Sequence, residues 1–514
     1  MKKMPQVLAL SIATLMSLIA CSTSPIATET TSQTNPSTAV AVVDKLRFDP
    51  TNYTQKTFDY RGKTYRYRAF ENIAYVKHPV EPDYQKINIY IPESYFNQET
   101  VNGFSEKTAP IFMPNSVGGY MPAKPATVED SGMPRPDASA NKENAIMMAL
   151  ANGYIVAAPG ARGRTLQSNG QYTGKAPAAI VDLKAAVRYL KANDSLMPGN
   201  ANKIISNGTS AGGALSLLLG SSGNQPAYEA DLTALGAADT TDDIWAVSAY
   251  CPIADLDHAD AAYEWQFNGV NDYQKMDSSM LDYHVQRKLV KGTLTPQQIS
   301  LSNQLKSLFP AYINSLHLTD SQGKLLSLDA QGDGSFKNWL VIHLIKSAQN
   351  ELNQGKDLST VPYLTIQEGK VTAFDFDLYN KTVGRQKTPP AFDGVDLSTG
   401  ENQLFGTATI DKQHFTPFSQ QHSTVANSSM ANSNVVSIMN PMTFLTPTNT
   451  KKLPKNWRIR VGTNDRDTSL AVATLIATRL QNQGKTVDFA MPWGVPHGGD
   501  YDLDQLLAWM RQLN

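Results

Sequence analysis

The sequence lacks an excess of either charge, because 45 Lys and Arg residues nearly balance 46 Asp and Glu residues for a formal net charge of −1. This balance gives no basic footprint for nucleic acid, so we expect no nucleic-acid partner. Long apolar runs are also lacking: after residue 20 none approaches the ~20 residues that span a bilayer. With 41% hydrophobic and 18% charged residues, the composition is that of a globular protein.

Cysteine is scarce, with only Cys21 and Cys251 among 514 residues. Residues 1–20 carry lysines ahead of an apolar stretch, a pattern typical of a signal peptide that is excluded from the fold. The stretch ends in Leu-Ile-Ala-Cys at 18–21, which resembles the bacterial lipoprotein processing box. The resemblance implies cleavage before Cys21 and lipidation of that residue, with ordinary secretion as the alternative.

Lipidation of Cys21 would anchor an exported protein in the cell envelope, in the outer membrane and periplasm or at the cell surface. It would also leave Cys251 without an intrachain partner, so we expect no disulfide and interpret Cys251 as a small buried side chain. Residues 21–43 are rich in Ser, Thr and Pro and poor in bulky apolar residues. They predict a disordered tether.

The central motif is Gly-Thr-Ser-Ala-Gly at residues 208–212, which follows an apolar strand-like run and precedes an apolar helix-like run. Its G-x-S-x-G pattern is weak alone, but a strand before it and a helix after it are the context of a nucleophile elbow. Small residues allow the strained turn that lifts a serine hydroxyl clear of the sheet. We therefore interpret Ser210 as a nucleophile, with an ordinary βα turn as the alternative.

Strand-like and helix-like segments alternate around this motif, which predicts a doubly wound, largely parallel α/β sheet. The predicted strands are 65–76, 86–91, 109–113, 154–158, 203–206, 244–250, 457–462 and 486–491. The predicted helices of the core are 144–152, 178–192, 214–219, 469–483 and 503–512.

The alternation stops after residue 252, and residues 253–435 have a helical and irregular pattern. We predict that this stretch is an inserted lid domain between two core segments, 44–252 and 436–514. Within it, residues 295–298 indicate a capped helix start and 336–352 a long helix.

A serine hydroxyl needs a histidine to take its proton and a carboxylate to orient that histidine. His497 lies among glycines in the loop after the last predicted strand, and Asp465 follows the strand before it. The order Ser210, Asp465, His497 is that of the α/β-hydrolase fold. We predict this catalytic triad, with the Ala211 N–H and a donor from loop 117–119, centred on Gly118, as the oxyanion hole.

Several stretches give a more specific resemblance, to the bacterial tannases (tannin acyl hydrolases), which are lidded α/β-hydrolases that cleave galloyl esters. They cover most of the chain after the tether and comprise 208–213, 250–256, 261–265, 387–393, 396–402, 465–467 and 496–499. The resemblance implies that Lys387, Glu401 and Asp467 grip the galloyl hydroxyls. The disulfide that fungal tannases and feruloyl esterases form beside the triad is not expected, because Thr209 and Pro496 occupy those positions.

The expected activity is thus hydrolysis of galloyl esters by a serine esterase that needs no cofactor. The alternatives are a general aryl or feruloyl esterase, a serine exopeptidase and a non-catalytic surface-binding module. Without the resemblance, Lys387 and Glu401 would be interpreted as a surface ion pair. The acidic stretch 255–260 fits no strong metal-ligand spacing, so we predict a capped helix start and no metal there. The oligomeric state is not predicted.

Overall fold

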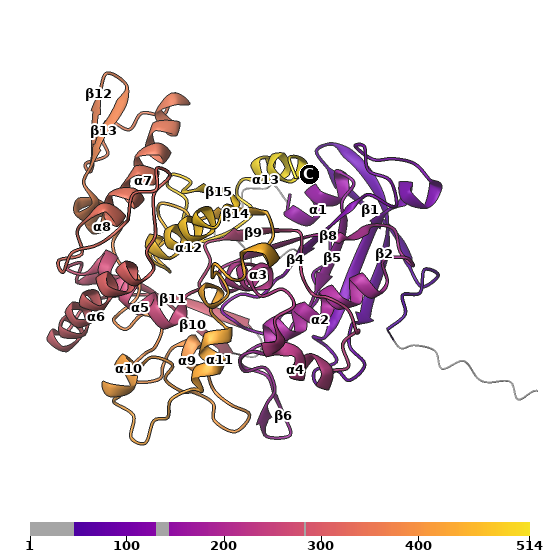
Figure 1. The fold of residues 1–514 in the computed structure, drawn as a ribbon, viewed down its shortest axis with the longest axis horizontal. Helices are drawn as coiled ribbons and strands as arrows, with labels where there is room; N and C mark the ends of the chain where they lie inside the picture. The colour runs from indigo at the N-terminus through magenta and orange to yellow at the C-terminus, as the bar shows by residue number, and fades with distance from the viewer. Residues whose placement is uncertain (1–45, 130–142, 282–283, 514) are drawn as a thin grey trace, which may run out of the picture. The chain divides into compact units, whose positions relative to one another are not determined.

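The computed structural model describes residues 46–129, 143–281 and 284–513 (Figure 1). The predicted signal peptide 1–20, lipidation site Cys21 and tether 21–43 lie outside the described residues, so these interpretations stay predictions. No helix of the described residues is both long and apolar enough to cross a membrane.

A nine-stranded sheet has the order β1-β2-β3-β5-β4-β8-β9-β14-β15. Its strands are β1 (Thr54–Tyr60), β2 (Lys63–Ala74), β3 (Lys86–Pro92), β4 (Pro110–Pro114), β5 (Ile155–Pro159), β8 (Asn200–Thr209), β9 (Ala246–Tyr250), β14 (Asn456–Arg460) and β15 (Thr486–Ala490). The pairs from β1 to β5 are antiparallel, and those from β5 to β15 are parallel. The predicted largely parallel sheet is therefore confirmed.

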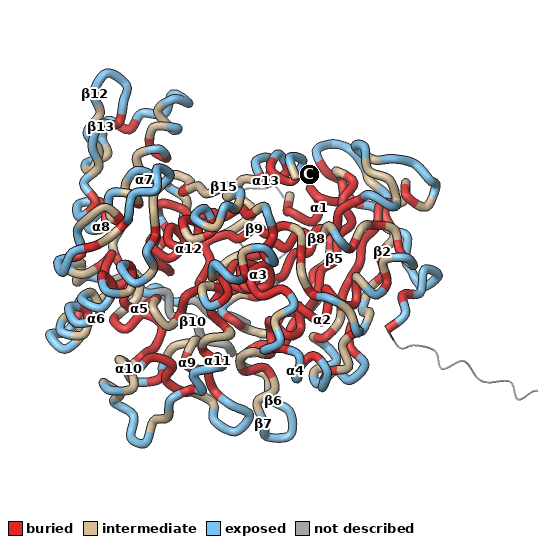
Figure 2. Tube along the Cα trace, in the orientation of Figure 1, coloured by how far each residue is buried: buried red, intermediate tan, exposed pale blue. Residues whose placement is uncertain are grey.

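Alternate residues of the central strands point to opposite faces of the sheet and join two apolar clusters. Ile111 and Ile204 belong to the cluster with α2 (Ala178–Ala192), α3 (Ala211–Ser221) and α12 (Leu470–Asn482). Phe112 and Ile205 belong to the cluster with α1 (Ala145–Ala151) and α13 (Leu503–Arg511). Because helices cover both faces, β4, β5 and β9 are buried throughout, and β8 is buried from residue 204 to residue 208 (Figure 2). The sheet is thus doubly wound, as predicted.

Between β9 and β14 the described chain adds no strand to this sheet. Its helices there are α5 (Leu256–Phe267), α6 (Pro296–Ser315), α7 (Ser335–Asn353), α8 (Phe376–Val383), α9 (Gly400–Leu404), α10 (Pro417–Gln421) and α11 (Ser433–Ile438). Trp265, Phe309 and Phe336 of this insertion belong to the same apolar cluster as the core helices. The insertion therefore shares a hydrophobic core with the sheet, and the predicted domain boundaries stay a prediction.

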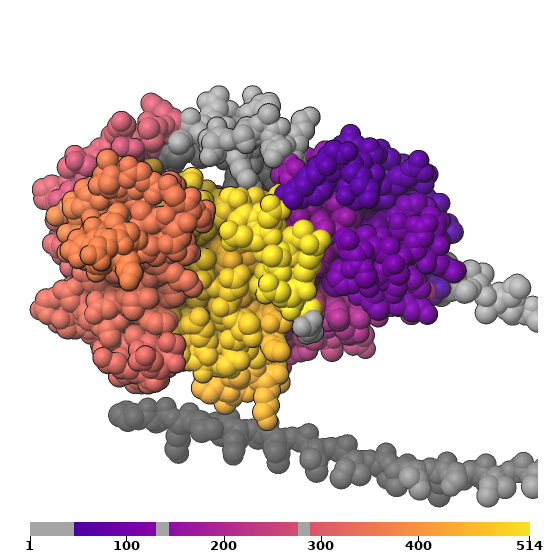
Figure 3. Space-filling model, turned by 90° about the horizontal axis from the view of Figure 1, so that it is seen from above, coloured from indigo at the N-terminus to yellow at the C-terminus, as the bar shows by residue number. Residues whose placement is uncertain are grey.

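The insertion also contains two hairpins that the sequence did not indicate, β10 (Asp272–Leu281) with β11 (His284–Thr293) and β12 (Leu364–Gln367) with β13 (Lys370–Phe374). The β12–β13 hairpin is largely exposed (Figure 2). Smaller elements are β6 (Gln167–Ser168), β7 (Gln171–Tyr172), α4 (Glu229–Ala234) and 3₁₀ turns at Glu93–Asn97, Pro226–Tyr228, Pro441–Thr443 and Thr450–Lys452. In Figures 1 and 3, the C-terminal segment (yellow) lies between the N-terminal strands (indigo) and the insertion (orange).

Candidate active site

The predicted nucleophile Ser210 lies in the turn between β8, which ends at Thr209, and α3, which begins at Ala211. Its φ of 62° and ψ of −122° are strained for a residue with a side chain. The Ser210 N–H donates to Tyr250 O at 3.0 Å, and the Ile253 N–H donates to Ser210 O at 3.2 Å. These bonds hold the sharp strand-to-helix turn that a nucleophile elbow needs.

Glycines beside Ser210 are required because the turn leaves no room for side chains. A Cβ atom at Gly208 would lie 2.2 Å from Gly212 O. A Cβ atom at Gly212 would lie 2.5 Å from Asn115 Oδ1, on the loop after β4. The motif therefore brings the elbow against the loop that was predicted to complete the oxyanion hole.

The predicted residues His497 and Asp465 form a hydrogen-bonded pair at the carboxyl ends of β15 and β14. Nδ1 of His497 lies 2.8 Å from Oδ2 of Asp465, whose side chain is fully buried. Burial of the ring opposes its charging, but the Asp465 carboxylate outweighs this cost and the pKa of His497 is raised well above its ordinary value. The pair can therefore orient the ring and stabilise an imidazolium ion.

Ser210 and His497 line the same cavity, which has a volume of about 140 Å³. Within the described residues no hydrogen bond joins Ser210 Oγ to the ring, and Nε2 of His497 lies 3.8 Å from Sγ of Cys251. Catalytic hydrogen bonds of this kind often tighten only in the substrate complex. The structure thus brings the predicted triad residues together, and their catalytic roles stay a prediction.

The cavity also has backbone groups of the predicted oxyanion hole on its wall. Ala211, at the start of α3, lines it together with Gly119 and Tyr120. Gly119 and Tyr120 have φ values of 55° and 54°, so the loop turns sharply beside the serine. The predicted Gly118 precedes this pair, and its carbonyl accepts the Met121 N–H at 2.9 Å. Ala211 and the Gly119 end of loop 117–119 therefore border the cavity that contains Ser210.

Lys387, Glu401 and Asp467, which the resemblance selected, line this cavity too. Lys387 and Glu401 come from the insertion and Asp467 from the loop after β14. The Lys387 ammonium and the Glu401 carboxylate have no hydrogen bond or ion pair with another described residue, and Lys387 Nζ lies 4.0 Å from the centre of the Phe392 ring. The alternative interpretation, a surface ion pair between Lys387 and Glu401, is not seen among the described residues, and both groups are free to bind a ligand.

A further set of polar contacts fixes the ligand-facing side chains. The Tyr263 hydroxyl accepts the N–H groups of Gln386 at 3.1 Å and Lys387 at 3.0 Å. Gln386 Nε2 donates to Oδ1 of Asp467 at 2.7 Å, and the Asp467 N–H donates to Oδ1 of Asp465 at 2.9 Å. Asp467 is therefore tied to both the insertion and the triad.

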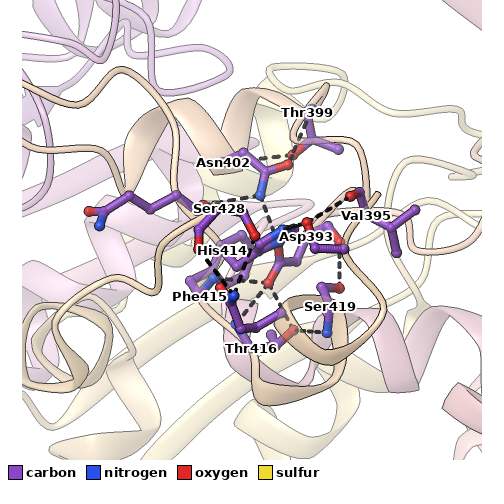
Figure 4. Close-up of polar contacts among 12 residues, drawn as sticks. Asp393, Val395, Thr399, Asn402, His414, Phe415, Thr416, Ser419 and Ser428 are labelled. Carbon is purple, nitrogen blue, oxygen red and sulfur yellow. Dashed lines mark hydrogen bonds and ion pairs between the residues drawn. The ribbon is translucent and has the colours of Figure 1, made fainter. Parts of the chain in front are cut away.

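Glu401 lies in the first turn of α9, whose N-terminus is capped by Thr399 and Asn402. Behind this turn is a buried polar network centred on Asp393 (Figure 4). One carboxylate oxygen of Asp393 lies 2.7 Å from Nδ2 of Asn402 and 2.8 Å from Nδ1 of His414. The other accepts the N–H and the hydroxyl of Thr416 at 2.7 and 2.8 Å. The network thus holds the capping residue that follows Glu401.

The acidic stretch 255–260 does not form the capped helix start that was predicted. α5 begins at Leu256, but the Asp255 side chain does not cap it and accepts instead from Asn440 at 2.8 Å and Tyr312 at 2.8 Å. His258 stacks on Tyr312 and lies 3.3 Å from Asp255. The carboxylate is drawn away from the helix because long-range partners compete for it.

Several residues around the site escaped the sequence analysis. Tyr263 lies inside one of the stretches that carried the resemblance, and Gln386 lies directly before another. Their polar side chains in these positions could have indicated a role at the site. Tyr120 directly follows the Gly118–Gly119 pair that the sequence analysis selected, whereas Arg164 lies in a loop without a motif and nothing in the sequence indicated it. A larger cavity of about 690 Å³ lies at the base of the β10–β11 hairpin and is lined by Arg466, but by none of the predicted site residues.

Comparison with known proteins identifies the family. The BD-FAE family model matches residues 132–298. The crystal structure of Fusobacterium nucleatum tannase is 50% identical, with a TM-score of 0.86 over 91% of this chain and 99% of that chain. Lactobacillus plantarum tannase is 44% identical, with a TM-score of 0.86 over 91% and 99% of the two chains.

A tannin acyl hydrolase in complex with ethyl gallate is also 44% identical, with a TM-score of 0.84 over 91% of this chain and 99% of that chain. No match was found among curated proteins. The predicted resemblance and fold class are therefore confirmed. The chain is a carboxylic ester hydrolase with the α/β-hydrolase fold, and it belongs to the tannase (tannin acyl hydrolase) family.

Proposed function

We propose that the protein hydrolyses galloyl esters to gallic acid and an alcohol through an acyl-enzyme on Ser210. The observation that carries the proposal is the cavity that Ser210 and His497 share with Lys387, Glu401 and Asp467. Similar structures contain ethyl gallate or 3,4-dihydroxybenzoate, which supports a phenolic acyl group as the ligand.

In the proposed acylation, Ser210 Oγ attacks the ester carbonyl carbon while its proton moves to Nε2 of His497. The carbonyl oxygen becomes an oxyanion beside Ala211 and the Gly119–Tyr120 loop, where backbone N–H groups can stabilise it. When the tetrahedral intermediate collapses, the ester C–O bond breaks and the His497 proton passes to the leaving alkoxide. Asp465 keeps its charge and stabilises the imidazolium ion throughout.

Deacylation repeats these steps with water as the nucleophile. His497 takes a proton from the water, the new C–O bond forms, and the bond to Ser210 Oγ breaks as the proton returns to that oxygen. Gallic acid then leaves the cavity, and the serine hydroxyl is restored. No cofactor supplies a step in this mechanism.

Selectivity for galloyl groups follows from the charged residues that share the cavity with Ser210 and His497. Each phenolic hydroxyl both donates and accepts, so the Glu401 and Asp467 carboxylates can accept from the ring while the Lys387 ammonium donates. A ring without hydroxyls would leave these half-buried charges unpaired. Discrimination by such a site can reach ~10⁴-fold.

The test is the rate on methyl gallate against methyl benzoate and methyl ferulate, measured with purified residues 22–514. We expect kcat/KM for methyl gallate to be far above the other two, and Ser210→Ala to abolish it. Equal rates on the three esters would indicate a general aryl or feruloyl esterase. Failure of a fluorophosphonate to label Ser210 would indicate a non-catalytic binding module instead. Cleavage of an aminoacyl amide would indicate a peptidase.

Two substitutions test the ring-binding residues separately from the triad. Lys387→Met and Glu401→Gln should each lower kcat/KM for methyl gallate about 100-fold, since each leaves a polar partner unpaired. Both should leave kcat/KM for 4-nitrophenyl acetate within about threefold, because that acyl group has no ring. The matched control is Lys381→Met, an exposed lysine on α8. An equal loss on both substrates would contradict the assigned roles.

We also propose that the exported protein is held in the cell envelope by a lipid on Cys21. The support is the Leu-Ile-Ala-Cys pattern at the end of the N-terminal apolar stretch. Growth with an alkynyl fatty acid should label the wild-type chain, and Cys21→Ser should remove the label and move the enzyme to the soluble fraction. An unlabelled, soluble wild-type protein would contradict the anchor.

A further inference from the structure

Arg164 lies in the segment between β5 and α2 and does not line the active-site cavity. Its backbone N–H donates to Tyr120 O at 2.9 Å, and its Nε donates to Gly119 O at 2.8 Å. One residue thus holds the two successive carbonyls of the loop that borders the cavity beside Ser210. Both loop residues have left-handed φ values, so their orientation is not the one an unrestrained chain would favour.

The other end of the guanidinium reaches the insertion. Nη1 of Arg164 donates to Oε1 of Gln403 on α9. The guanidinium also lies against Gly400, where a Cβ atom would be 3.0 Å from its Cζ. Glu401, which lines the cavity, is on the same short helix as these two contacts. Arg164 therefore touches the residues on both sides of Glu401.

The charge of Arg164 has no carboxylate within ion-pairing distance among the described residues. Burial lowers the pKa of its guanidinium, and the nearby carboxylates of Glu401 and Asp411 oppose that shift. A half-buried cation without an ion pair is costly unless its donors are used. Here the cost is offset by the hydrogen bonds that the guanidinium donates to Gly119 O beside the cavity and to Gln403 Oε1 on α9.

We propose that Arg164 is a positioning residue that couples the oxyanion loop to the galloyl-binding helix α9. The peptide unit between Gly119 and Tyr120 is planar and trans, so its N–H points away from the carbonyl that Arg164 holds. Fixing the carbonyl therefore fixes the direction of a backbone donor at the cavity. The bond to Gln403 and the contact with Gly400 set the position of α9, and with it Glu401, relative to that donor.

This inference rests on the proposed function. The effects of Arg164 on the oxyanion loop and on α9 can be tested separately with two kinds of ester. The oxyanion loop serves every ester, whereas α9 serves only esters with a galloyl ring. Loss of Arg164 should therefore lower kcat on a simple ester and also reduce the preference for methyl gallate. Loss of Gln403 alone should affect the binding of the galloyl ring, because the bond from Arg164 Nε to Gly119 O remains.

The experiment compares Arg164→Met, Arg164→Lys, Gln403→Ala and Lys175→Met with the wild-type chain on 4-nitrophenyl acetate and methyl gallate. Lys175 is the matched control, since its Nζ also ties the β5–α2 segment to the insertion, through Asp411 O and Oδ1 at 2.8 Å each. Its Nζ makes no hydrogen bond with Gly119, although Oδ1 of Asp411 also accepts from Gln403 Nε2 on α9 at 2.9 Å, so Lys175 is a control for the oxyanion loop. Melting temperatures of all variants report any loss of folding.

We expect Arg164→Met to lower kcat on 4-nitrophenyl acetate about tenfold, less than the ~100-fold or more that follows removal of an oxyanion donor itself. Arg164→Lys should be impaired similarly, because one ammonium cannot reproduce the planar fork that reaches both partners. Gln403→Ala removes the hydrogen bonds with Arg164 and Asp411. It should raise KM for methyl gallate about fivefold, with a change below about twofold in kcat on 4-nitrophenyl acetate. Lys175→Met should lower the melting temperature without a loss of kcat on 4-nitrophenyl acetate.

An unchanged kcat on 4-nitrophenyl acetate in Arg164→Met, full activity of Arg164→Lys, or the same kinetic pattern in Lys175→Met would overturn the proposal. Failure of the proposed function is a separate result, because it would be seen in the wild-type chain as a lack of preference for methyl gallate. In that case the loss of kcat on 4-nitrophenyl acetate would still test the link between Arg164 and the oxyanion loop.

Discussion

The Sγ atom of Cys251 lies 3.8 Å from Nε2 of His497, the ring nitrogen that takes the serine proton in the proposed mechanism. The thiol is 1% exposed and donates to Gly498 O at 3.3 Å. Cys251 is thus the small buried side chain that the sequence suggested, but it also forms part of the packing that fixes the histidine ring. Its size should therefore matter more than its chemistry.

Two substitutions of Cys251 test this role. Cys251→Ala leaves the bond between His497 and Asp465 intact, so kcat/KM for 4-nitrophenyl acetate should fall by less than about tenfold. Cys251→Leu adds volume beside the ring, and a displacement of ~1 Å at a reacting group can cost about 100-fold. Steady-state kinetics with melting temperatures check both values. Equal losses in the two variants would show that the thiol itself, and not its volume, is required.

The raised pKa of His497 predicts the pH dependence of the reaction. Burial opposes the charge on the ring, but Asp465 and, more weakly, Cys251 and Asp467 raise its pKa well above the ordinary value. Since the neutral ring accepts the serine proton, kcat/KM should increase with pH through a limb that lies above about 6.5. Asp467→Asn should move this limb to lower pH, measured with 4-nitrophenyl acetate so that galloyl binding does not contribute.

The control for this shift is Asp504→Asn, which removes an exposed carboxylate on α13 and should leave the limb in place. A limb that stays at the same pH in Asp467→Asn would show that Asp467 does not act on the ring. A wild-type limb below about 6.5 would contradict the direction of the shift itself.

Two adjacent glycines beside His497 should respond differently to alanine. A Cβ atom at Gly499 would lie 2.0 Å from Oγ1 of Thr209, the residue before Ser210, whereas a Cβ atom at Gly498 meets nothing within 4 Å. Gly499→Ala must push the histidine loop or the elbow aside, so we expect kcat/KM for methyl gallate to fall at least about tenfold. Gly498→Ala should remain within about twofold, because nothing has to move. Similar rates in the two variants would contradict this account.

The core and the triad could be predicted because their signals are local. The expected helix 178–192 coincides with α2, since residues close together in the sequence determine both its apolar spacing and its ends. Ser210, Asp465 and His497 each follow a strand of the parallel sheet, and parallel strands place their carboxyl ends at one edge. Chain order and strand ends were therefore sufficient to select three residues that the fold brings together.

The hairpins and the supporting residues could not be predicted, because their signals are not local. In β12 the apolar residues alternate over only four positions, too few to distinguish a strand from a loop. Arg164 is separated from Gln403 by 239 positions, and no motif marks either residue. The sequence indicated Lys387 and Glu401 only through family resemblance. Whether their charges are available to a ligand depends on which other groups the fold pairs with them.

Asp393 supports the galloyl site from behind, and its replacement by asparagine should show how much the network contributes. Its carboxylate contacts the side chain of Asn402, the ring of His414 and the backbone N–H groups of Phe415 and Thr416, all within 2.9 Å. Asp393→Asn replaces one acceptor oxygen by an amide NH2 group that faces other donors in a buried site, so the free energy of unfolding should fall by about 3 kcal/mol. Denaturant unfolding measures this loss.

The matched control is Asp396→Asn, three positions away on the same loop, where the carboxylate is exposed and accepts one N–H from Ser398 at 3.1 Å. That change should lower the free energy of unfolding by less than about 0.5 kcal/mol. Because Asn402 follows Glu401, the weakened network should also raise KM for methyl gallate more than it changes kcat on 4-nitrophenyl acetate. If the two variants unfold at the same denaturant concentration, the buried network does not stabilise the insertion, and Glu401 must be held by the contacts of α9 with Arg164.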